Sequence, residues 1–408
     1  MEEIGNMEEK FNKKQSGITL VALVVTIVVL LILAGITIMY TMGDNSIFKK
    51  AQEAKDKTDQ AIKDEQEYFN NLDNVINQYL DGNSTDSNKV DVSTITTKVD
   101  KNTPAKDSLG NPITIPEGFK VVPDGQDGVE YTYTGDKKPT VQDGIVIEDE
   151  EGNQFVWIPV GNVKNKDGSF TTIQLARYTF DITLNSDTGK ISGGTGAIKQ
   201  TIADGTGLTD EWVEVNGGGY EYIEEVSTST TYGNTKAKNI EEFKTKSKSN
   251  GGYYLARYEA SEGSDNKVKS KLAAVWNNIT QPDAATKARE MYNSNSFESD
   301  LVNSYAWDTA IVFIQAYSRD HDYSKEVGSV FSSSLVNTGT TTDKRCNIYD
   351  MASNTLEWTT ETCTYANNPC AIRGGFYDDD INYTASRLAD DTSNNHDHVS
   401  FRPLLYVK

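Results

Sequence analysis

The sequence predicts an α+β protein in which a long N-terminal helix, transmembrane at first and then amphipathic, precedes a globular domain. Residues 18–42 are almost wholly apolar, and no charged residue lies between Lys14 and Asp44. Residues 47–80 repeat apolar side chains at alternating spacings of three and four, which is typical of an amphipathic helix. Beyond residue 111, short β-branched and aromatic runs alternate with turns rich in Gly, Asn and Asp, as strands do.

The composition restricts the class of partner. The chain has 408 residues, a hydrophobic fraction of 37% and a net charge of −21. A nucleic-acid-binding protein normally presents a basic face, which this sequence lacks, so nucleic acid is excluded as a partner. Anionic lipid headgroups are disfavoured for the same reason. Divalent cations and the polar faces of sugars or proteins fit better, and an acidic surface that only maintains solubility is the alternative.

Four segments follow from these patterns. Residues 1–17 form a polar leader, 18–81 the transmembrane and amphipathic helix, 82–110 a linker with room for a short strand at 90–98, and 111–408 the globular domain. The apolar run exceeds the roughly 20 residues that a helix needs to cross a bilayer. Lysines next to it favour a cytoplasmic N-terminus. A cleaved secretory signal is shorter than this run, and a plain signal anchor is the other alternative.

The junction between leader and apolar run resembles the type IV pilin and pseudopilin family. The leader ends in Lys13, Lys14, Gln15, Ser16 and Gly17, and the apolar helix starts at Ile18. The resemblance implies cleavage between Gly17 and Ile18 by a prepilin peptidase, followed by methylation. It also implies a single-pass protein of the bacterial cell membrane, with an extracellular C-terminal domain on the cell surface or a pilus. The family has a glutamate where this chain has Ala22, so assembly with other pilin subunits is left open.

Within the globular domain we expect strands in residues 113–122, 144–161 and 251–261. Helices are expected near 239–249, 281–294 and 300–318, with surface loops over much of 184–250. A short sequence, Leu-Ala-Arg-Tyr, occurs twice, ending at Tyr178 and at Tyr258.

The last 64 residues carry a set of motifs that resembles the formylglycine-generating-enzyme and sulfatase-modifying family. The matching residues are Asn347, Asp350, Met351, Asn354, Glu357, Trp358, Arg373, Gly374, Gly375, Arg387, Phe401 and Arg402. The resemblance covers residues 150–408 with large insertions and implies a C-type-lectin-like fold. We expect Trp358, Arg373, Gly374, Gly375 and Arg402 to be structural residues of that fold.

Two oxygen-bearing residues are calcium candidates. Asn354 and Glu357 lie three residues apart in a turn-rich segment, and oxygen ligands of this kind suit Ca²⁺. The resemblance implies calcium at these positions; structural hydrogen bonds are the alternative. Ser353 and Leu356 replace the family's usual glycine and tryptophan. No other cofactor is expected.

The cysteines argue against catalysis. The family's enzymes use a cysteine directly after the last arginine, but Pro403 follows Arg402 here, and no cysteine lies beyond residue 370. We therefore predict no catalytic residues. Cys363 and Cys370 are left either to form a disulfide or to stay reduced, and Cys346 is unpaired in the first case.

Aromatic and adaptable polar side chains gather between Gly375 and Phe401, as they do in antibody loops. We predict a ligand-binding surface made of Tyr377, Asp378, Asp379, Asp380, Asn382, Tyr383, Asp390, Asp391, Asn394, Asn395, His396, Asp397 and His398. These loops resemble those of lectin-like proteins that retroelements diversify.

Together these patterns predict a pilin-like, membrane-anchored surface protein whose non-catalytic C-type-lectin-like head serves adhesion or binds a protein or carbohydrate ligand. The alternatives are a surface enzyme of the sulfatase-modifying type and a purely structural minor pilin.

Overall fold

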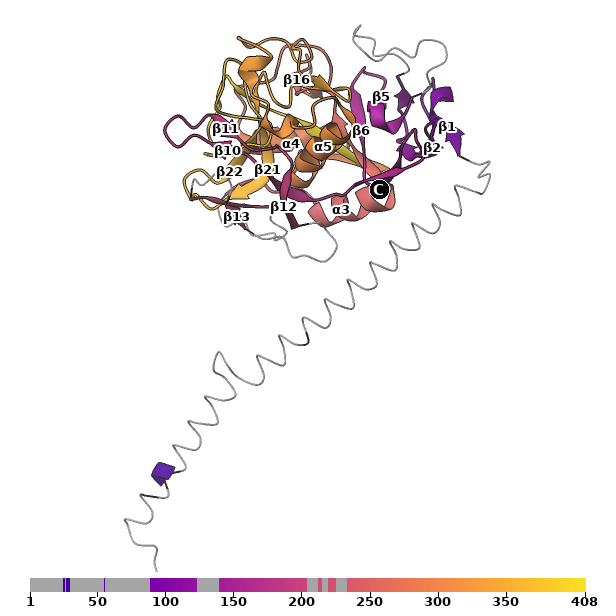
Figure 1. Cartoon of the computed structure of the whole chain (residues 1–408). Helices are drawn as coiled ribbons and strands as arrows, with labels where there is room; N and C mark the ends of the chain where they lie inside the picture. The colour runs from indigo at the N-terminus through magenta and orange to yellow at the C-terminus, as the bar shows by residue number, and fades with distance from the viewer. Residues whose placement is uncertain are drawn as a thin grey trace, which may run out of the picture. The chain divides into compact units, whose positions relative to one another are not determined.

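The computed structural model describes residues 89–122, 139–203, 212–214, 219–224 and 233–408, together with Val25, residues 27–29 and Lys55. The chain divides into two compact units, Met1–Asn71 and Leu72–Lys408. Every strand and helix named below belongs to the second unit (Figure 1).

The predicted fold class is wrong, because the described residues form mainly β-sheets with few helices. No helix among them is long and apolar enough to cross a membrane. The longest, α5 (Ser304–Tyr317), has 14 residues and spans about 21 Å, less than the ~30 Å of a bilayer core. This finding contradicts the predicted long transmembrane helix and the predicted single-pass membrane location. The Gly17–Ile18 processing site, and residues 18–81 apart from the few named above, lie outside the described residues.

The centre of the second unit is an antiparallel six-stranded sheet in the order β18-β25-β15-β6-β5-β4. Its strands are β4 (Lys120–Val121), β5 (Val146–Glu148), β6 (Gln154–Pro159), β15 (Gly252–Ala256), β18 (Phe297–Leu301) and β25 (Pro403–Val407). The C-terminal strand β25 therefore lies inside the sheet, where Leu404 pairs with both Leu255 and Asp300. The strands expected in residues 113–122, 144–161 and 251–261 are confirmed.

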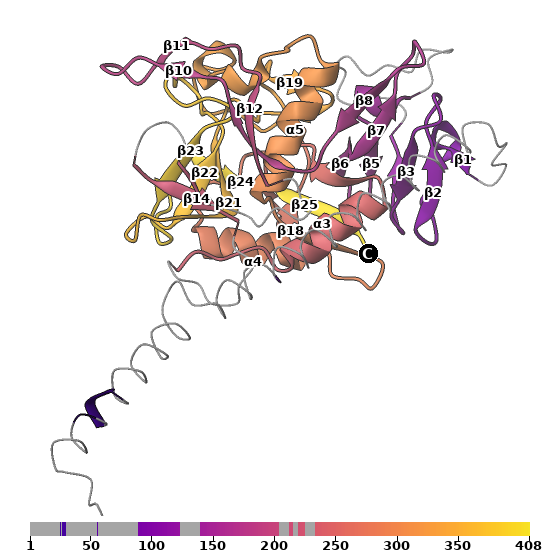
Figure 2. The same cartoon turned by 60° about the horizontal axis from the view of Figure 1, so that its bottom comes forward.

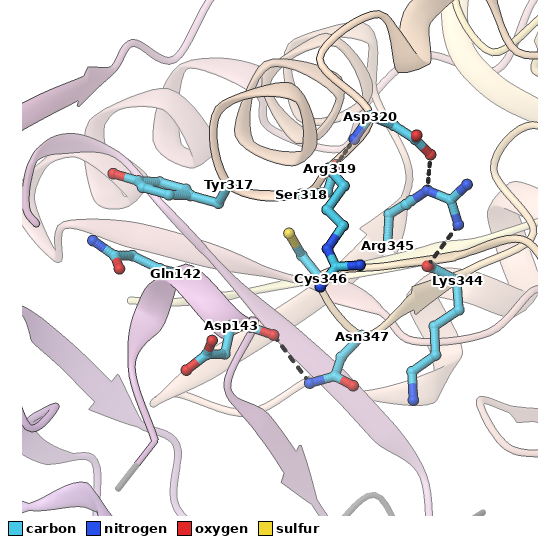
Figure 3. A pocket seen from close by; sticks show the side chains of 10 residues that line it. All are labelled: Gln142, Asp143, Tyr317, Ser318, Arg319, Asp320, Lys344, Arg345, Cys346 and Asn347. Carbon is cyan, nitrogen blue, oxygen red and sulfur yellow. Dashed lines mark hydrogen bonds and ion pairs between the residues drawn. The ribbon is translucent and has the colours of Figure 1, made fainter. Parts of the chain in front are cut away.

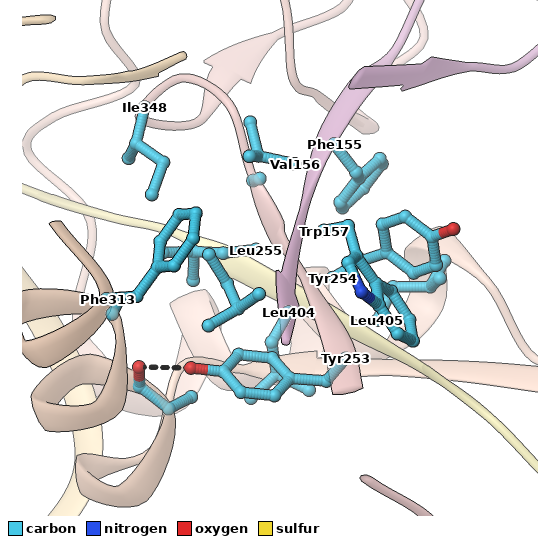
Figure 4. Packing of buried hydrophobic residues seen from close by; sticks show 14 of the residues in the cluster. Phe155, Val156, Trp157, Tyr253, Tyr254, Leu255, Phe313, Ile348, Leu404 and Leu405 are labelled. Carbon is cyan, nitrogen blue, oxygen red and sulfur yellow. Dashed lines mark hydrogen bonds between the residues drawn. The ribbon is translucent and has the colours of Figure 1, made fainter. Parts of the chain in front are cut away.

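A continuous cluster of buried apolar residues packs against this sheet (Figure 4). Phe155 and Trp157 of β6, Leu255 of β15 and Leu404 of β25 are fully buried. The Tyr253 hydroxyl is buried as well and donates to the Ala306 carbonyl of α5 at 2.6 Å. This bond satisfies the buried Tyr253 hydroxyl.

A second six-stranded sheet runs β13-β14-β21-β22-β23, with β24 parallel to β21. Its strands are β13 (Val213–Glu214), β14 (Glu221–Ile223), β21 (Leu356–Cys363), β22 (Cys370–Arg373), β23 (Arg387–Asp390) and β24 (Val399–Phe401). Every residue of β21 is buried. Figure 2 shows this sheet and a small sheet of β1 (Val90–Asp91), β2 (Thr103–Lys106) and β3 (Pro112–Ile115) on opposite sides of the central strands.

Three α-helices are described: α3 (Ile240–Ser249), α4 (Gln281–Met291) and α5 (Ser304–Tyr317). Each starts at a side-chain cap, supplied by Asn239, Thr280 and Asn303 respectively. The helices expected near 239–249 and 281–294 are confirmed, the second ending three residues early. The third starts at Ser304 and not at residue 300, because the first residues of that range complete β18.

The segment predicted as a linker forms structure from residue 89 onward. It contains β1 (Val90–Asp91), η1 (Val92–Thr94) and β2 (Thr103–Lys106), which with β3 (Pro112–Ile115) make a three-stranded sheet. Residues expected as surface loops likewise form short hairpins. The remaining elements are β7 (Gly161–Lys164), β8 (Phe170–Ile173), β9 (Arg177–Phe180), β10 (Thr183–Leu184), β11 (Ile191–Gly193), β12 (Ile198–Ala203), β16 (Ser261–Glu262), β17 (Val268–Lys269), β19 (Lys344–Arg345), β20 (Ile348–Tyr349), η2 (Val141–Asp143), η3 (Tyr323–Lys325) and η4 (Gly328–Val330).

Candidate functional site

Arg373, at the end of β22, belongs to a buried ionic network beneath the C-terminal loops. Its guanidinium donates to Asp308 of α5 (Nη2–Oδ1, 2.5 Å) and to the Ser386 carbonyl (Nε–O, 2.7 Å). Arg387 of β23 binds the same aspartate and also Glu361 of β21 (Nε–Oε1, 2.9 Å). The four charged side chains are fully buried. The network therefore connects β21, β22 and β23 to α5 and gives the loops a fixed base.

The two glycines after Arg373 allow a close backbone crossing. A Cβ atom at Gly374 would lie 2.7 Å from the Met351 carbonyl oxygen, and one at Gly375 would lie 2.5 Å from that of Ala352. Gly374 also has a φ of 88°, a conformation that glycine adopts without strain. Both positions therefore exclude larger residues.

Arg402 and Glu357 form a second buried ionic contact. Arg402 Nε lies 3.0 Å from Glu357 Oε2, and Arg402 Nη2 lies 2.5 Å from Oε1. The same guanidinium donates to the carbonyl oxygens of Ala256 and Tyr349. Both oxygens of the carboxylate thus accept from one arginine, in the bidentate geometry that arginine favours.

The calcium candidates do not fit a cation in this arrangement. The Glu357 carboxylate is occupied by Arg402, whose positive charge would oppose a metal ion. Asn354 is fully buried; its Nδ2 donates to Glu259 and its Oδ1 accepts from the Val336 amide at 3.1 Å. Across the described part of the chain, no three His, Cys, Asp or Glu side chains are grouped to hold a metal. The geometry favours structural hydrogen bonds at both residues.

Trp358 and the cysteines lie inside the protein. Trp358 is fully buried, and its Nε1 donates to the Ile279 carbonyl at 2.8 Å. Cys363 ends β21 and Cys370 starts β22, both buried, and all three cysteines of the chain are free thiols here. Burial raises the pKa of Cys363 and of Cys370. Both therefore favour the protonated, unreactive form.

The predicted loop residues divide into supports and exposed groups. Asp379, Tyr383 and Asp390 are buried. Asp379 accepts from the amides of Ile381 and Asn382, and Asp390 accepts from Asn394 Nδ2. These buried residues support the conformation of the loops. The partly or fully exposed members are Tyr377, Asp378, Asp380, Asn382, Asp391, Asn394, Asn395, His396, Asp397 and His398.

Four rings from two separate loops lie in contact and form what we call the aromatic row: Tyr377, Phe376, His398 and His396. Ring centroids lie 5.8 Å apart for Tyr377–Phe376, 4.9 Å for Phe376–His398 and 5.1 Å for His398–His396. Carboxylates flank the histidines. Asp390 lies 3.2 Å from His396 Nε2, and Asp397 lies 3.0 Å from His398 Nδ1. The row therefore joins two loops that are about 20 residues apart in the sequence.

Neighbouring segments extend this surface. The Ser329 amide donates to the Asp379 carbonyl, and the Asp378 amide donates to the Ser332 carbonyl, so η4 and the residues after it lie against the first loop. Val330 and Ile381 on these segments expose 64% and 45% of their area. Asp380 forms an ion pair with a lysine of the segment between β10 and β11, Lys190. An exposed apolar patch beside aromatic and polar groups is typical of an interaction site.

Sequence reasoning missed Phe376 and the β10–β11 contribution. Phe376 directly follows the Arg-Gly-Gly sequence and precedes Tyr377, and this aromatic pair was the available indication. The contact with Lys190 spans 190 positions, and no local pattern predicts it.

No family model matches the chain, and no curated protein matches it. Among solved structures, the chain is similar to the crystal structure of CarF, with 13% identity and a TM-score of 0.29 over 62% of this chain and 98% of that one. It is also similar to a Major Tropism Determinant M1 variant, with 11% identity and a TM-score of 0.26 over 78% of this chain and 85% of that one. Neither TM-score establishes a shared fold, and no match supports the pilin or the formylglycine-generating resemblance.

Proposed function

We propose that this chain is a non-catalytic binding protein of C-type-lectin-like character, which recognises a protein or carbohydrate ligand through the aromatic row. The observation that carries the proposal is the contact between Phe376 and His398. It merges two loops into one partly exposed surface of rings, amides and carboxylates. Rings of this kind supply large contact area at low entropic cost, and the flanking polar groups supply directional hydrogen bonds.

The support beneath the row is consistent with recognition. Trp307 of α5 donates to the Thr384 carbonyl at 2.9 Å, and the Asn278 amide donates to the His396 carbonyl at 3.0 Å. Together with the Arg373 network, these bonds hold both loops against other parts of the protein. A surface that is already ordered loses less entropy on binding, which favours affinity.

The arrangement of thiols supports a non-catalytic role. Arg402 is fully buried against Glu357, and the residue after it is a proline in β25. Cys363 and Cys370 lie buried in another sheet. A thiol-dependent oxidase of the sulfatase-modifying type needs a reactive thiolate, and neither buried thiol favours that form. An assay for formylglycine formation by the full chain tests this point; turnover would overturn it.

Binding is tested with the full chain on a glycan array and on a panel of immobilised extracellular proteins. For any ligand that is retained, we expect the double variant Tyr377→Ala/His398→Ala to lose tenfold or more in affinity, about 1.4 kcal/mol. Phe170→Ala is the matched control, since Phe170 is an exposed ring on β8, outside this surface. Equal loss in the control, or no loss in the double variant, would contradict the proposal.

A further inference from the structure

A separate cavity of about 630 Å³ lies between the end of α5, η2 and the β19–β20 hairpin (Figure 3). It shares no lining residue with the aromatic row. Its volume falls within the range of roughly 300–1,000 Å³ that small-molecule sites occupy.

The charge of this cavity is opposite to that of the chain. Its lining includes three cationic side chains, Arg319, Lys344 and Arg345, and two carboxylates, Asp143 and Asp320. The chain as a whole carries −21. A local excess of positive charge on an acidic protein attracts anions that the remaining surface repels.

Only one of these cations is without a protein partner. Arg345 pairs with Asp320, and Lys344 lies over the Tyr349 ring at 5.2 Å. Arg319 is exposed at the cavity, and within the described ranges it forms no ion pair or hydrogen bond. Its guanidinium is therefore available as a donor.

The carboxylates and the hairpin turn form a fixed wall. Asp143 Oδ2 accepts from Thr140 Oγ1 at 2.6 Å. The Asp143 carboxylate is therefore bound to the residue that precedes its own 3₁₀ helix, η2. Asn347 Nδ2 donates to the Asp143 and Gly144 carbonyls, at 3.1 and 2.8 Å. Cys346 and Asn347 have φ of 46° and 66° in a two-residue turn, and the half-buried Cys346 lines the cavity.

We propose that this cavity binds a small molecule carrying a carboxylate or phosphate oxyanion, held by the guanidinium of Arg319. The planar fork of arginine donors matches both oxyanions. The Tyr317 ring, on another wall of the cavity, offers apolar contact to the body of the ligand.

Cys346 provides a reporter for this site. Iodoacetate and iodoacetamide alkylate thiols by the same reaction and differ by one negative charge. Alkylation of Cys346 in the full chain is measured by peptide mass spectrometry. We expect the ratio of the iodoacetate rate to the iodoacetamide rate to be higher at Cys346 than for free cysteine. Arg319→Gln should slow the iodoacetate reaction by about fivefold and leave the iodoacetamide reaction nearly unchanged. Burial raises the pKa of the Cys346 thiol, which slows both reagents alike and leaves their ratio informative.

Lys199→Gln is the matched control, because it removes one exposed positive charge from β12, outside the cavity. Its reagent ratio should equal that of the wild type. Succinate and inorganic phosphate then compete with iodoacetate: protection by succinate assigns a carboxylate ligand, and protection by phosphate assigns a phosphate. A ratio equal to that of free cysteine, a ratio unchanged in Arg319→Gln, or protection by neither anion would overturn the proposal.

Discussion

Arg402 and Glu357 connect the two large sheets of the protein. Glu357 lies in β21 of the second sheet, and Arg402 immediately precedes β25 of the central sheet. Their bidentate contact is fully buried, and Arg402 also reaches the carbonyls of Ala256 and Tyr349. From its place between β24 and β25, one guanidinium thus contacts β15, β20 and β21.

Removing one partner of this pair should strongly destabilise the fold. Glu357→Gln leaves the Arg402 charge buried without its bidentate partner, and we expect a loss of about 3–5 kcal/mol in the free energy of unfolding. The double variant Glu357→Leu/Arg402→Met removes both charges and should lose less than Glu357→Gln alone. Urea denaturation followed by circular dichroism measures both.

The matched control is Glu241 on α3, an exposed carboxylate that pairs with the largely buried Lys244. Glu241→Gln should change the free energy of unfolding by less than about 1 kcal/mol, because solvent screens that pair. Similar losses in Glu241→Gln and Glu357→Gln would show that burial of the Arg402 pair has no special effect.

Gly374 should tolerate alanine poorly because of the Met351 carbonyl. Gly168 has nearly the same φ, 85° against 88°, but a Cβ there would meet no atom within 4 Å. Alanine at either position adds backbone strain on the order of 1 kcal/mol. Only Gly374→Ala adds the steric contact, so its melting temperature should fall well below that of Gly168→Ala. Equal melting temperatures in differential scanning calorimetry would rule out the close crossing.

Calcium should leave the stability unchanged, because Arg402 occupies the Glu357 carboxylate. An ion present at 100 times its dissociation constant would add about 2.7 kcal/mol. We expect millimolar Ca²⁺, compared with EDTA, to shift the melting temperature by less than about 1 °C. A saturable increase that disappears in Asn354→Ala would restore the calcium site.

Local patterns predicted much of the fold. The helices expected near residues 239–249 and 281–294 match α3 and α4, and runs of β-branched and aromatic residues located β3, β6 and β15. The start of α5 was misplaced because β18 is buried along its whole length, so it shows no alternation that would separate it from the helix after it. The predicted membrane helix rested on hydropathy, flanking lysines and a resemblance, and it found no counterpart among the described helices.

The candidate sites depended on contacts that local patterns do not contain. The Arg-Gly-Gly sequence was expected to be structural, but it did not indicate that Arg373 contacts Asp308, 65 positions away. The polar loops were identified by composition, which did not separate buried supports such as Asp379 from exposed groups. The cavity beside Arg319 went unnoticed, because its walls come from three distant segments and no motif joins them.

The pH dependence of stability should have a maximum near pH 4.5, set by buried carboxyl groups of opposite behaviour. Burial raises the pKa of Glu224 from 4.5 to about 7, against the hydrogen bonds it accepts from Ser304 and Thr360. Burial also acts to raise the pKa of Glu361, but the guanidinium groups of Arg387, Arg177 and Arg373 outweigh it and lower that pKa to about 2.

Proton linkage sets the direction in which each carboxyl group changes the free energy of unfolding with pH. Glu224 binds its proton more tightly in the folded state. Its contribution to the free energy of unfolding is therefore complete below pH 4.5 and is lost as the pH rises to about 7. Glu361 contributes fully above pH 4.5 and loses this contribution as the pH falls to about 2. Between pH 4.5 and 7, the raised pKa of Glu224 corresponds to a loss on the order of 3 kcal/mol in the free energy of unfolding.

Glu224→Gln tests this assignment, because glutamine resembles the protonated acid and does not titrate. The free energy of unfolding of this variant, measured in urea at pH 4.5, 6 and 7.5, should decline less steeply than that of the wild type. Some decline remains, since burial also raises the pKa of Asp350 to about 7. The control Glu221→Gln, in the preceding strand β14 but exposed, should follow the wild-type curve. If Glu224→Gln follows it too, Glu224 is not the titrating group.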